Sequence, residues 1–475
     1  MPITDYSEHD GLELAELVRS REVTPAELAE AAIERIERHG QLNAVVYKAY
    51  DQARSTAAGG LPDGPFKGVP FLVKDLGLEV AGMPRSSGSR FSTSDPDTRD
   101  SELVRRYRAA GMVLVGKTNT PEFGIPGVTQ SERLGPCRNP WNTDHITGGS
   151  SGGAASAVAA GIVPMAHASD GLGSIRIPAA ACGLVGLKPT RDRNPNGPED
   201  HDRTIGLAVD HVVSRTVRDS AAMLDATGYP EAGAPYAPAP KARPYLDEVG
   251  ASPGKLRIAW SAATARGGPI DPEVQAAVEA IVELLSGLGH EVVPFEPQVD
   301  WRKLYRAQAY MSASNFSAGM KRRIEALGRE PADDELGQLA RRAYEGGKRV
   351  TGQQALWGFQ EVRVTTRRML EQLEPFDAFL QPVMTAPAPR IEDLDPVAMP
   401  IEDFDKAQSQ LYGYTPPANF TGAPSMSLPL AWSSAGLPIG LQFTGRYGDE
   451  ATLFRLAGQL EKEKPWAGRR PPVWG

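Results

Sequence analysis

The sequence predicts an α/β protein in which helices cover a large β-sheet. Short apolar runs typical of buried strands alternate with segments of helical periodicity along most of the chain. Hydrophobic residues make up 41% and charged residues 23% of the chain, which is ordinary globular composition. With 475 residues, the chain is long enough to bury a large core without disulfide bonds or metal ions.

The first part of the chain is predicted to be helical. Residues 24–27 (TPAE) combine a capping box with proline at the first helical position, and apolar residues then recur at helical spacing. After a loop rich in glycine and proline, residues 69–73 have the pattern of a short buried strand that ends at Lys74.

The middle of the chain continues the alternation. We expect a helix over residues 101–110 and a strand over 112–115. A loop of glycine and serine at 148–153 leads into a helix of small residues at 154–160, and a strand is expected at 162–165.

The last part of the chain begins after residues 230–254, which are rich in proline and alanine. This segment fits either a domain linker or a surface excursion within one domain. Beyond it we expect strands at 256–260, 291–293, 378–380 and 439–443, and helices after the Asp271-Pro272 cap, within 301–373 and at 450–463.

Charge and cysteine content argue against several functions. The net charge is −8 and no block of lysine and arginine stands out, so nucleic-acid binding is not expected. Two cysteines, Cys137 and Cys182, cannot form a disulfide framework and are expected to be buried small residues. The most apolar stretch, 154–168, is too short and interrupted to span a bilayer. Because the N-terminus lacks a signal-peptide pattern, we expect a cytoplasmic protein.

Residues 111–118 (GMVLVGKT) match the pattern of a phosphate-binding loop. Such a loop needs a strand before it and a helix after it, so that free backbone N–H groups cradle the phosphates. Here the four residues after the first glycine would themselves form a strand, and residues 119–121 (NTP) are a poor helix start. We interpret the match as coincidence, which argues against nucleotide binding.

Residues 148–153 (GGSSGG) resemble a flexible connector when taken alone. Their neighbours argue against a connector, because Trp141 and a compact apolar helix flank them instead of polar low-complexity sequence. Four glycines around Ser150 and Ser151 permit unusual backbone conformations and the close approach of a substrate.

Residues 170–178 (DGLGSIRIP) contain the candidate nucleophile, Ser174. The default interpretation is a glycine turn followed by a strand. The functional interpretation places Ser174 on a tight turn whose consecutive N–H groups point at one spot. Such groups form an oxyanion hole, which stabilises the charge that develops on a carbonyl oxygen.

Lys74 is the candidate base. A lysine at a strand end is usually solvated, but a neutral lysine serves as a base when burial and nearby positive charge lower its pKa. Arg176 is the expected positive neighbour. Of seven histidines, His167 lies closest to Ser174 in sequence; we expect a hydrogen-bonded core residue there, and it is the alternative base. No His-Glu-x-x-His or Cys-x-x-Cys motif is present, so no metal site is expected.

Three motifs in this order resemble the amidase signature family: GVPFLVKD (68–75), GGSSGG (148–153) and GSIRIPA (173–179). The resemblance extends over nearly the whole chain through KTNTPEFG (117–124), RNPWN (138–142), CGLVGLKPT (182–190), NFTGAPSMSLPL (419–430) and GLPIGLQFTG (436–445). It implies a large mixed β-sheet covered on both faces by helices, in one domain over residues 1–475. The parts of that domain would be an N-terminal helical segment (1–60), a signature core (61–229) and a C-terminal half with substrate-pocket elements (255–475).

The resemblance also assigns roles by position. In the family's pattern the base is Lys74, the bridging serine at a cis peptide bond is Ser150, and the nucleophile is Ser174. The oxyanion loop would be Gly171, Leu172 and Gly173, and the supporting residues Asp170, Arg176 and Ser151.

The chain departs from the family pattern at three places. Leu172 occupies a position that is usually glycine, which would narrow the oxyanion loop or reshape the acyl pocket. Cys137 replaces a common threonine, and residues 191–193 (RDR) replace a usual Gly-Arg. Residues 165–171 (MAHASDG) and 443–461 are similar to the branch of 6-aminohexanoate cyclic-dimer hydrolases.

The activity implied by the resemblance is hydrolysis of a small-molecule amide through an acyl-enzyme, without a cofactor. Linear, aryl and cyclic amides all stay open as substrates. One alternative is the related amidotransferase subunit that feeds ammonia to charged transfer RNA, which needs partner chains. Another is a non-catalytic binding protein on the same scaffold, against which the intact Lys74, Ser150 and Ser174 argue. No nucleic-acid or membrane partner is expected, and a homodimer is compatible with the sequence.

Overall fold

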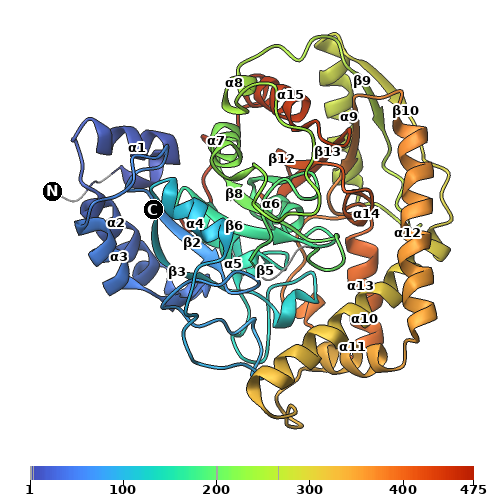
Figure 1. The fold of residues 1–475 in the computed structure, drawn as a ribbon. Coiled ribbons are helices and arrows are strands. Elements are labelled where there is room, and N and C mark those ends of the chain that lie inside the picture. The colour runs from blue at the N-terminus through green and yellow to red at the C-terminus, as the bar shows by residue number, and fades with distance from the viewer. Residues whose placement is uncertain (1–2, 4, 199–201, 266) are drawn as a thin grey trace.

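A single large sheet forms the centre of the computed structural model, which describes residues 3, 5–198, 202–265 and 267–475 (Figure 1). Within these residues the sheet has 11 strands. Their order in space is β1 (Val45–Lys48), β3 (Val113–Thr118), β2 (Pro70–Lys74), β6 (Met165–Asp170), β8 (Val209–Ser214), β7 (Val185–Lys188), β12 (Ser425–Trp432), β13 (Pro438–Gly445), β11 (Ala378–Pro382), β9 (Arg257–Trp260) and β10 (Glu291–Pro294).

The sheet is mixed. Strand β2 runs parallel to β3 and β6, and β9 runs parallel to β10 and β11. The strands between these two parallel groups, from β6 to β11, pair antiparallel. Two short strands, β4 (Arg138–Asn139) and β5 (Asn142–Ile146), form a separate hairpin. The predicted α/β class and mixed central sheet are therefore confirmed.

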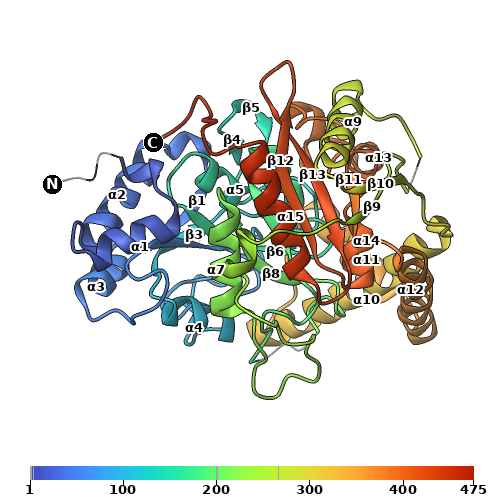
Figure 2. The same ribbon diagram turned by 90° about the horizontal axis from the view of Figure 1, so that it is seen from above.

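Helices cover both faces of this sheet. On one face, buried side chains of β7, β12 and β13 share a core with α7 (Val217–Thr227), α9 (Pro272–Gly287) and α15 (Glu450–Glu463). In the view from above, α7 and α15 lie in front of the strands (Figure 2). On the other face lies α6 (Arg176–Cys182), whose Ala179 and Ala180 lie against Gly186 of β7 and Gly440 of β13, and α5 (Gly152–Ala159) packs against α6 and β6.

Most of the remaining helices lie towards the two ends of the sheet. Near its β1–β3 edge lie α1 (Gly11–Arg19), α2 (Pro25–Arg38) and α3 (Tyr50–Ala58) (Figure 1), whereas α4 (Glu102–Ala109) packs against α7. The other helices are α8 (Leu246–Val249), α10 (Trp301–Leu327), α11 (Gln338–Lys348), α12 (Gly352–Leu373), α13 (Ile401–Leu411) and α14 (Pro416–Thr421). Helix α10 packs against both α11 and α12, and α12 packs against α14. Among the described helices, none combines the length and apolar character needed to cross a membrane.

Several predicted elements are confirmed with their physical cause. Helix α2 begins after Thr24, whose side chain accepts the N–H of Glu27 while the Glu27 carboxylate accepts the N–H of Thr24. Helix α9 begins after the Asp271 cap. The segment 230–254 lies on the surface of the same fold, because α8 packs against α7 and α15 and Tyr245 is buried.

The strand predicted at 162–165 was wrong. Helix α5 ends instead in a tight turn, in which Gly161 has a φ of 73° and the N–H of Ile162 donates to Ala157. Ile162 is apolar because it covers the end of that helix, a common arrangement at helix C-termini. The strand itself, β6, starts at Met165 and extends to Asp170, directly before the turn that carries Ser174.

Candidate active site

The side chain of Lys74 is fully buried at the carboxyl end of β2. Its amine Nζ lies 2.8 Å from Ser150 Oγ, 2.8 Å from Ser151 Oγ and 3.0 Å from Ser169 Oγ. Ser150 and Ser151 come from the glycine loop before α5, and Ser169 from the end of β6. Lysine and two loop serines that are about 76 positions apart in sequence thus meet in space, and a third serine joins them.

Burial lowers the pKa of Lys74 to about 7. The carboxylates of Asp210 and Asp170 oppose this shift, and the guanidinium of Arg203 adds to it. The expected fall in pKa is therefore confirmed in direction. The expected positive neighbour was wrong, since the guanidinium of Arg176 is held by Asp170 and the cation that lowers the pKa of Lys74 is Arg203.

The glycine loop is held by hydrogen bonds from two threonines. Thr129 Oγ1 donates to the Gly148 carbonyl at 2.9 Å, and Thr120 Oγ1 donates to the Ser150 carbonyl at 3.1 Å. The Gly149–Ser150 peptide bond is cis, as the resemblance implied. A Cβ atom at Gly149 would lie 2.7 Å from the backbone nitrogen of Val128, so the chain passes too closely for a larger residue.

Ser174 lies on the turn between β6 and α6, partly exposed to solvent. Its hydroxyl has no hydrogen-bond partner within the part of the chain that the structure describes. Ile177, in the first turn of α6, connects this turn to the glycine loop. A Cβ at Gly148 would lie 2.9 Å from the Ile177 side chain, and a Cβ at Gly173 would lie 2.7 Å from it. Both loops therefore pack against the same residue.

Asp170 organises the turn below Ser174. Its carboxylate accepts the N–H of Gly173 at 2.6 Å and of Ile175 at 3.2 Å, and it forms a buried ion pair with Arg176 at 3.0 Å. Burial raises the pKa of Asp170, but the charge and hydrogen bonds of Arg176 outweigh that effect and bring it to about 2. The carboxylate is therefore ionised at neutral pH and fixes the backbone around the candidate nucleophile.

The same hydrogen bond revises the predicted oxyanion loop. Because the Gly173 N–H donates to Asp170, it is not free to bind an oxyanion. Among the described residues, the N–H groups of Gly171 and Leu172 donate to no other protein group. The Leu172 carbonyl accepts the Thr415 hydroxyl at 2.7 Å, which turns this peptide outward from the sheet's loop and holds it.

The Leu172 side chain packs at the edge of a cluster formed by α10 and α12. Leu304 and Met311 of α10 and Val362 of α12 are buried there, together with Phe420. A glycine at position 172 would leave this contact empty. The departure from the family pattern therefore ties the candidate oxyanion loop to a pair of helices from the other half of the chain.

The predictions made for His167, Cys137, Cys182 and the phosphate-loop match are confirmed. His167 is buried, with Nδ1 bonded to the Lys74 N–H and Nε2 to Asp210. Cys137 and Cys182 are buried, and burial raises the pKa of both thiols, to about 12 for Cys137. Lys117 lies within β3, so the phosphate-loop match was coincidental. In the described segments, no three side chains of His, Cys, Asp or Glu are grouped to hold a metal ion.

Three supporting residues from the C-terminal half were not singled out from the sequence. Asn419 Nδ2 donates to the Asp170 carboxylate at 2.8 Å and to its carbonyl at 3.0 Å, and Arg176 donates to Asn419 at 2.7 Å and to Gln442 at 2.8 Å. Thr415 is the third. Asn419 and Gln442 lie in two of the segments that resemble the family, 419–430 and 436–445. The resemblance therefore pointed to these segments, but not to the individual residues.

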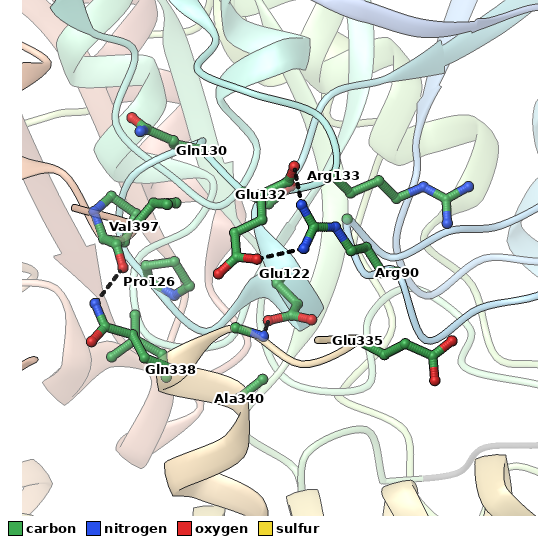
Figure 3. Close-up of a pocket in the computed structure, with 15 residues that line it drawn as sticks. Arg90, Glu122, Pro126, Gln130, Glu132, Arg133, Glu335, Gln338, Ala340 and Val397 are labelled. Atoms are coloured by element: carbon green, nitrogen blue, oxygen red, sulfur yellow. Dashed lines mark hydrogen bonds and ion pairs between the residues drawn. The ribbon is translucent and has the colours of Figure 1, made fainter. Parts of the chain in front are cut away.

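A separate polar hollow lies between residues 88–90 and 122–133 on one side and the start of α11 on the other (Figure 3). None of the predicted site residues lines it. Arg90 pairs with Glu132 at 2.8 Å, and the Glu122 carboxylate accepts the Gly337 N–H at 2.9 Å. The charged side chains of Arg90, Glu132 and Glu122 are therefore already bonded within the protein.

Comparison with known proteins identifies the family. The family model described as Amidase matches residues 27–454. The chain is also 36% identical to the 6-aminohexanoate-cyclic-dimer hydrolase of Paenarthrobacter ureafaciens, with 98% of this chain and 96% of the relative covered. The chain belongs to the amidase family.

Solved amidases share the whole fold. The structure of 6-aminohexanoate cyclic dimer hydrolase complexed with substrate matches with a TM-score of 0.94 and 34% identity, covering 99% of this chain and 100% of that chain. A bacterial aryl acylamidase of the amidase signature family matches with a TM-score of 0.87 and 27% identity, covering 97% and 99%. The resemblance to the cyclic-dimer hydrolase branch is thereby confirmed, and this amidase is a hydrolase of carbon–nitrogen bonds.

Proposed function

We propose that this amidase cleaves carboxylic amides through an acyl-enzyme, with Ser174 as nucleophile, Ser150 as proton relay and Lys74 as base. The observation that carries the proposal is the buried amine of Lys74, held 2.8 Å from Ser150 Oγ in surroundings that lower its pKa to about 7. A neutral amine at this place can accept a proton near neutral pH.

The hydrogen bonds around the amine support the choice of Ser150 as the relay. A neutral amine donates two protons and accepts one, so one of its three hydroxyl neighbours donates to it. The Ser151 hydroxyl already donates to the Ser169 carbonyl at 3.2 Å. Of the two remaining hydroxyls, that of Ser150 belongs to the loop packed with the Ser174 turn against Ile177.

The reaction then runs in two steps. The Ser174 hydroxyl gives its proton to Ser150, which gives its own to Lys74, and the freed oxygen attacks the amide carbonyl carbon. The N–H groups of Gly171 and Leu172 bind the oxyanion. As the carbon–nitrogen bond breaks, the proton returns through Ser150 to the leaving nitrogen. Water then attacks the ester at Ser174 by the same route, releasing the acid and restoring the three side chains.

For the substrate we propose a small linear or cyclic amide, with no cofactor. The relatives named above are a cyclic-dimer hydrolase and an aryl acylamidase, so their substrates differ although the fold is shared. Cyclic amides come first because the cyclic-dimer hydrolase is 36% identical over almost the full chain. The purified chain, without any partner, would be assayed on linear amides, anilides, cyclic dimers and lactams. Activity only in the presence of partner chains would support the amidotransferase alternative.

The roles are tested with a fluorophosphonate probe, which reacts with an activated serine. We expect the label on Ser174, full loss of labelling in Ser174→Ala and slower labelling in Lys74→Ala and Ser150→Ala. Peptide mapping decides the outcome: a label on Ser150 or Ser151 would reverse the roles assigned to the serines.

A further inference from the structure

Next to Lys74, three polar residues form a connected buried group: His167 on β6, Asp210 on β8 and Arg203 on the loop before β8. His167 and Asp210 are almost completely buried, and the Arg203 side chain is only 13% exposed. None of the three belongs to the proposed catalytic set. Buried polar groups of this kind are costly unless they are fully paired, so their arrangement calls for a physical role.

His167 connects this group to the backbone of the base. Strand β2 pairs with β6 through Leu72 and Ala166, two positions before Lys74. At Lys74 the backbone N–H donates to the side chain, Nδ1 of His167, at 3.2 Å. Since Nδ1 accepts, the ring proton is on Nε2, which donates to Asp210 Oδ1 at 3.0 Å. Burial lowers the pKa of His167, which keeps the ring neutral and able to accept.

Asp210 is held as an anion between His167 and Arg203. The guanidinium of Arg203 donates to its second carboxylate oxygen. Burial raises the pKa of Asp210, but the charge of Arg203 and the hydrogen bond from His167 outweigh it, leaving that pKa well below its usual range. A negative charge and a positive charge that both act on Lys74 are therefore fixed by hydrogen bonds.

The polar and charged groups near Lys74 come from several elements. Asp210 from β8 and Asp170 from β6 favour its charged form, and Arg203 favours its neutral form. The loop before α5 contributes the hydroxyls of Ser150 and Ser151. From α4, the Tyr107 ring lies 6.1 Å from the His167 ring, and burial keeps its phenol neutral by raising its pKa.

We propose that His167, Asp210 and Arg203 are positioning residues: His167 fixes the end of β2, and the Asp210–Arg203 pair sets the pH at which Lys74 becomes available as a base. This inference rests on the proposed role of Lys74. The two charges act on Lys74 in opposite directions. Removal of the Asp210 charge and removal of the Arg203 charge should therefore shift the pH dependence of activity in opposite directions. A merely structural role for the pair would not produce shifts of opposite sign.

The test is the pH profile of kcat/KM on one stable amide. The acid limb of this profile is the part in which kcat/KM rises with pH. Asp210→Asn keeps the shape of the side chain and removes its negative charge, so the charged form of Lys74 loses stabilisation and the acid limb moves to lower pH by roughly one unit. Arg203→Met removes the positive charge and leaves Asp210 unopposed, so the limb moves to higher pH by roughly one unit. Arg203→Lys keeps the charge and is expected to keep the limb near its wild-type position.

The role of His167 is tested by a pair of variants. His167→Leu cannot accept the Lys74 N–H and is expected to lower kcat about tenfold with little change in KM, since only the base is misplaced. In His167→Asn, the amide oxygen occupies the place of Nδ1 and restores part of the lost kcat. Equal losses in both variants would overturn the role of this hydrogen bond.

Arg106→Met is the matched control, because Arg106 is also a buried arginine paired with a carboxylate, on α4. We expect its acid limb to coincide with that of the wild type. Coincident limbs in active Asp210→Asn and Arg203→Met would overturn the inference while leaving the proposed function intact. Substantial activity in Lys74→Met would overturn the proposed function instead. If Arg203→Met does not fold, the shift of Asp210→Asn decides alone.

Discussion

Lys74 and Lys188 are two buried lysines with the same electrostatic outcome and different surroundings. Both are at most 1% exposed, and burial lowers the pKa of both to about 7. Lys74 contacts three hydroxyls, and that of Ser150 belongs to the loop that packs with the Ser174 turn against Ile177. Lys188, at the end of β7, donates to the carbonyl of the adjacent Pro189 at 2.8 Å. Burial therefore brings the pKa of an amine near neutrality in both places, but of the two lysines only Lys74 is bonded to hydroxyls beside the turn of the proposed nucleophile.

The difference teaches that a shifted pKa does not identify a base. Burial acts on any amine that the fold removes from water, whatever its function. What distinguishes Lys74 is the geometry of the acceptors and donors around it. The following predictions test this contrast, from the largest expected effect to the smallest.

The largest effect is expected for a change at Ser174, to which the proposed proton relay from Lys74 leads. Ser174→Ala removes the proposed nucleophile and should lower kcat/KM by at least about ten-thousand-fold, because residues that act as a unit fail together. The fold should be unchanged, since the Ser174 hydroxyl makes no hydrogen bond to the described residues. The assay is amide hydrolysis with circular dichroism as the folding control. Wild-type-like turnover by the folded variant would remove the reason to distinguish the two lysines.

The two lysines themselves are compared next. Lys74→Met should lower kcat/KM by at least about a thousand-fold, whereas Lys188→Met should stay within about tenfold of the wild type. In the wild type and in Lys188→Met, kcat/KM should rise with pH and level off above about 7, the pKa of Lys74, because only the neutral amine accepts a proton. The measurement is the full pH profile of each protein. If Lys188→Met lost the rise of kcat/KM with pH and Lys74→Met kept it, Lys188 would be the base instead of Lys74.

The Asp170–Arg176 ion pair affects the pKa of both lysines. Both of its charges act on Lys188, and the charge of Asp170 also acts on Lys74. Asn419→Ala removes the amide that bonds both partners of this pair. Because buried polar groups are then left unsatisfied, we expect a loss of about 3 kcal/mol in the free energy of unfolding. Urea unfolding measures it, and Gln298→Ala, on the surface, is the control. A loss no larger than the control's would show that the network does not depend on this amide.

The smallest effect is expected at Leu172, which touches neither lysine. Leu172→Gly opens space next to α10 and α12, so kcat/KM for amides with bulky acyl groups should rise a few-fold relative to acetamide-like substrates, within the range expected for one side chain in an apolar pocket. Paired assays on a short and a long acyl chain measure the ratio. An unchanged ratio would mean that Leu172 supports the loop without shaping the acyl pocket.

Much of the fold could be predicted because local signals agreed with the final structure. The cap at Thr24 and the Asp271-Pro272 start of α9 work within one or two helical turns. Strand β8 could not be predicted in the same way. It buries Asp210 and His211 in the middle of its sequence, and such polar residues are tolerated only because partners from other elements bond them.

The candidate site shows the same division. The motifs carried the positions of Lys74, Ser150 and Ser174, whose roles remain proposals. The cation that lowers the pKa of Lys74 could not be found from the motifs. Arg203 lies outside them, and only the folding of the sheet brings it near the lysine. The engagement of the Gly173 N–H by Asp170 is likewise a matter of three-dimensional geometry.

The close packing of the glycine loop has a consequence for altering this enzyme by random mutagenesis. A Cβ at Gly153 would lie 2.3 Å from the backbone nitrogen of Asn119, and one at Gly149 would lie 2.7 Å from that of Val128. Backbone atoms cannot yield as flexible side chains do, so variants with larger residues in this loop are expected to fold poorly. Leu172 instead meets side chains of α10 and α12, which can repack around an exchanged residue. New substrate ranges are therefore to be sought there, in a half of the chain that contributes none of the three proposed catalytic groups.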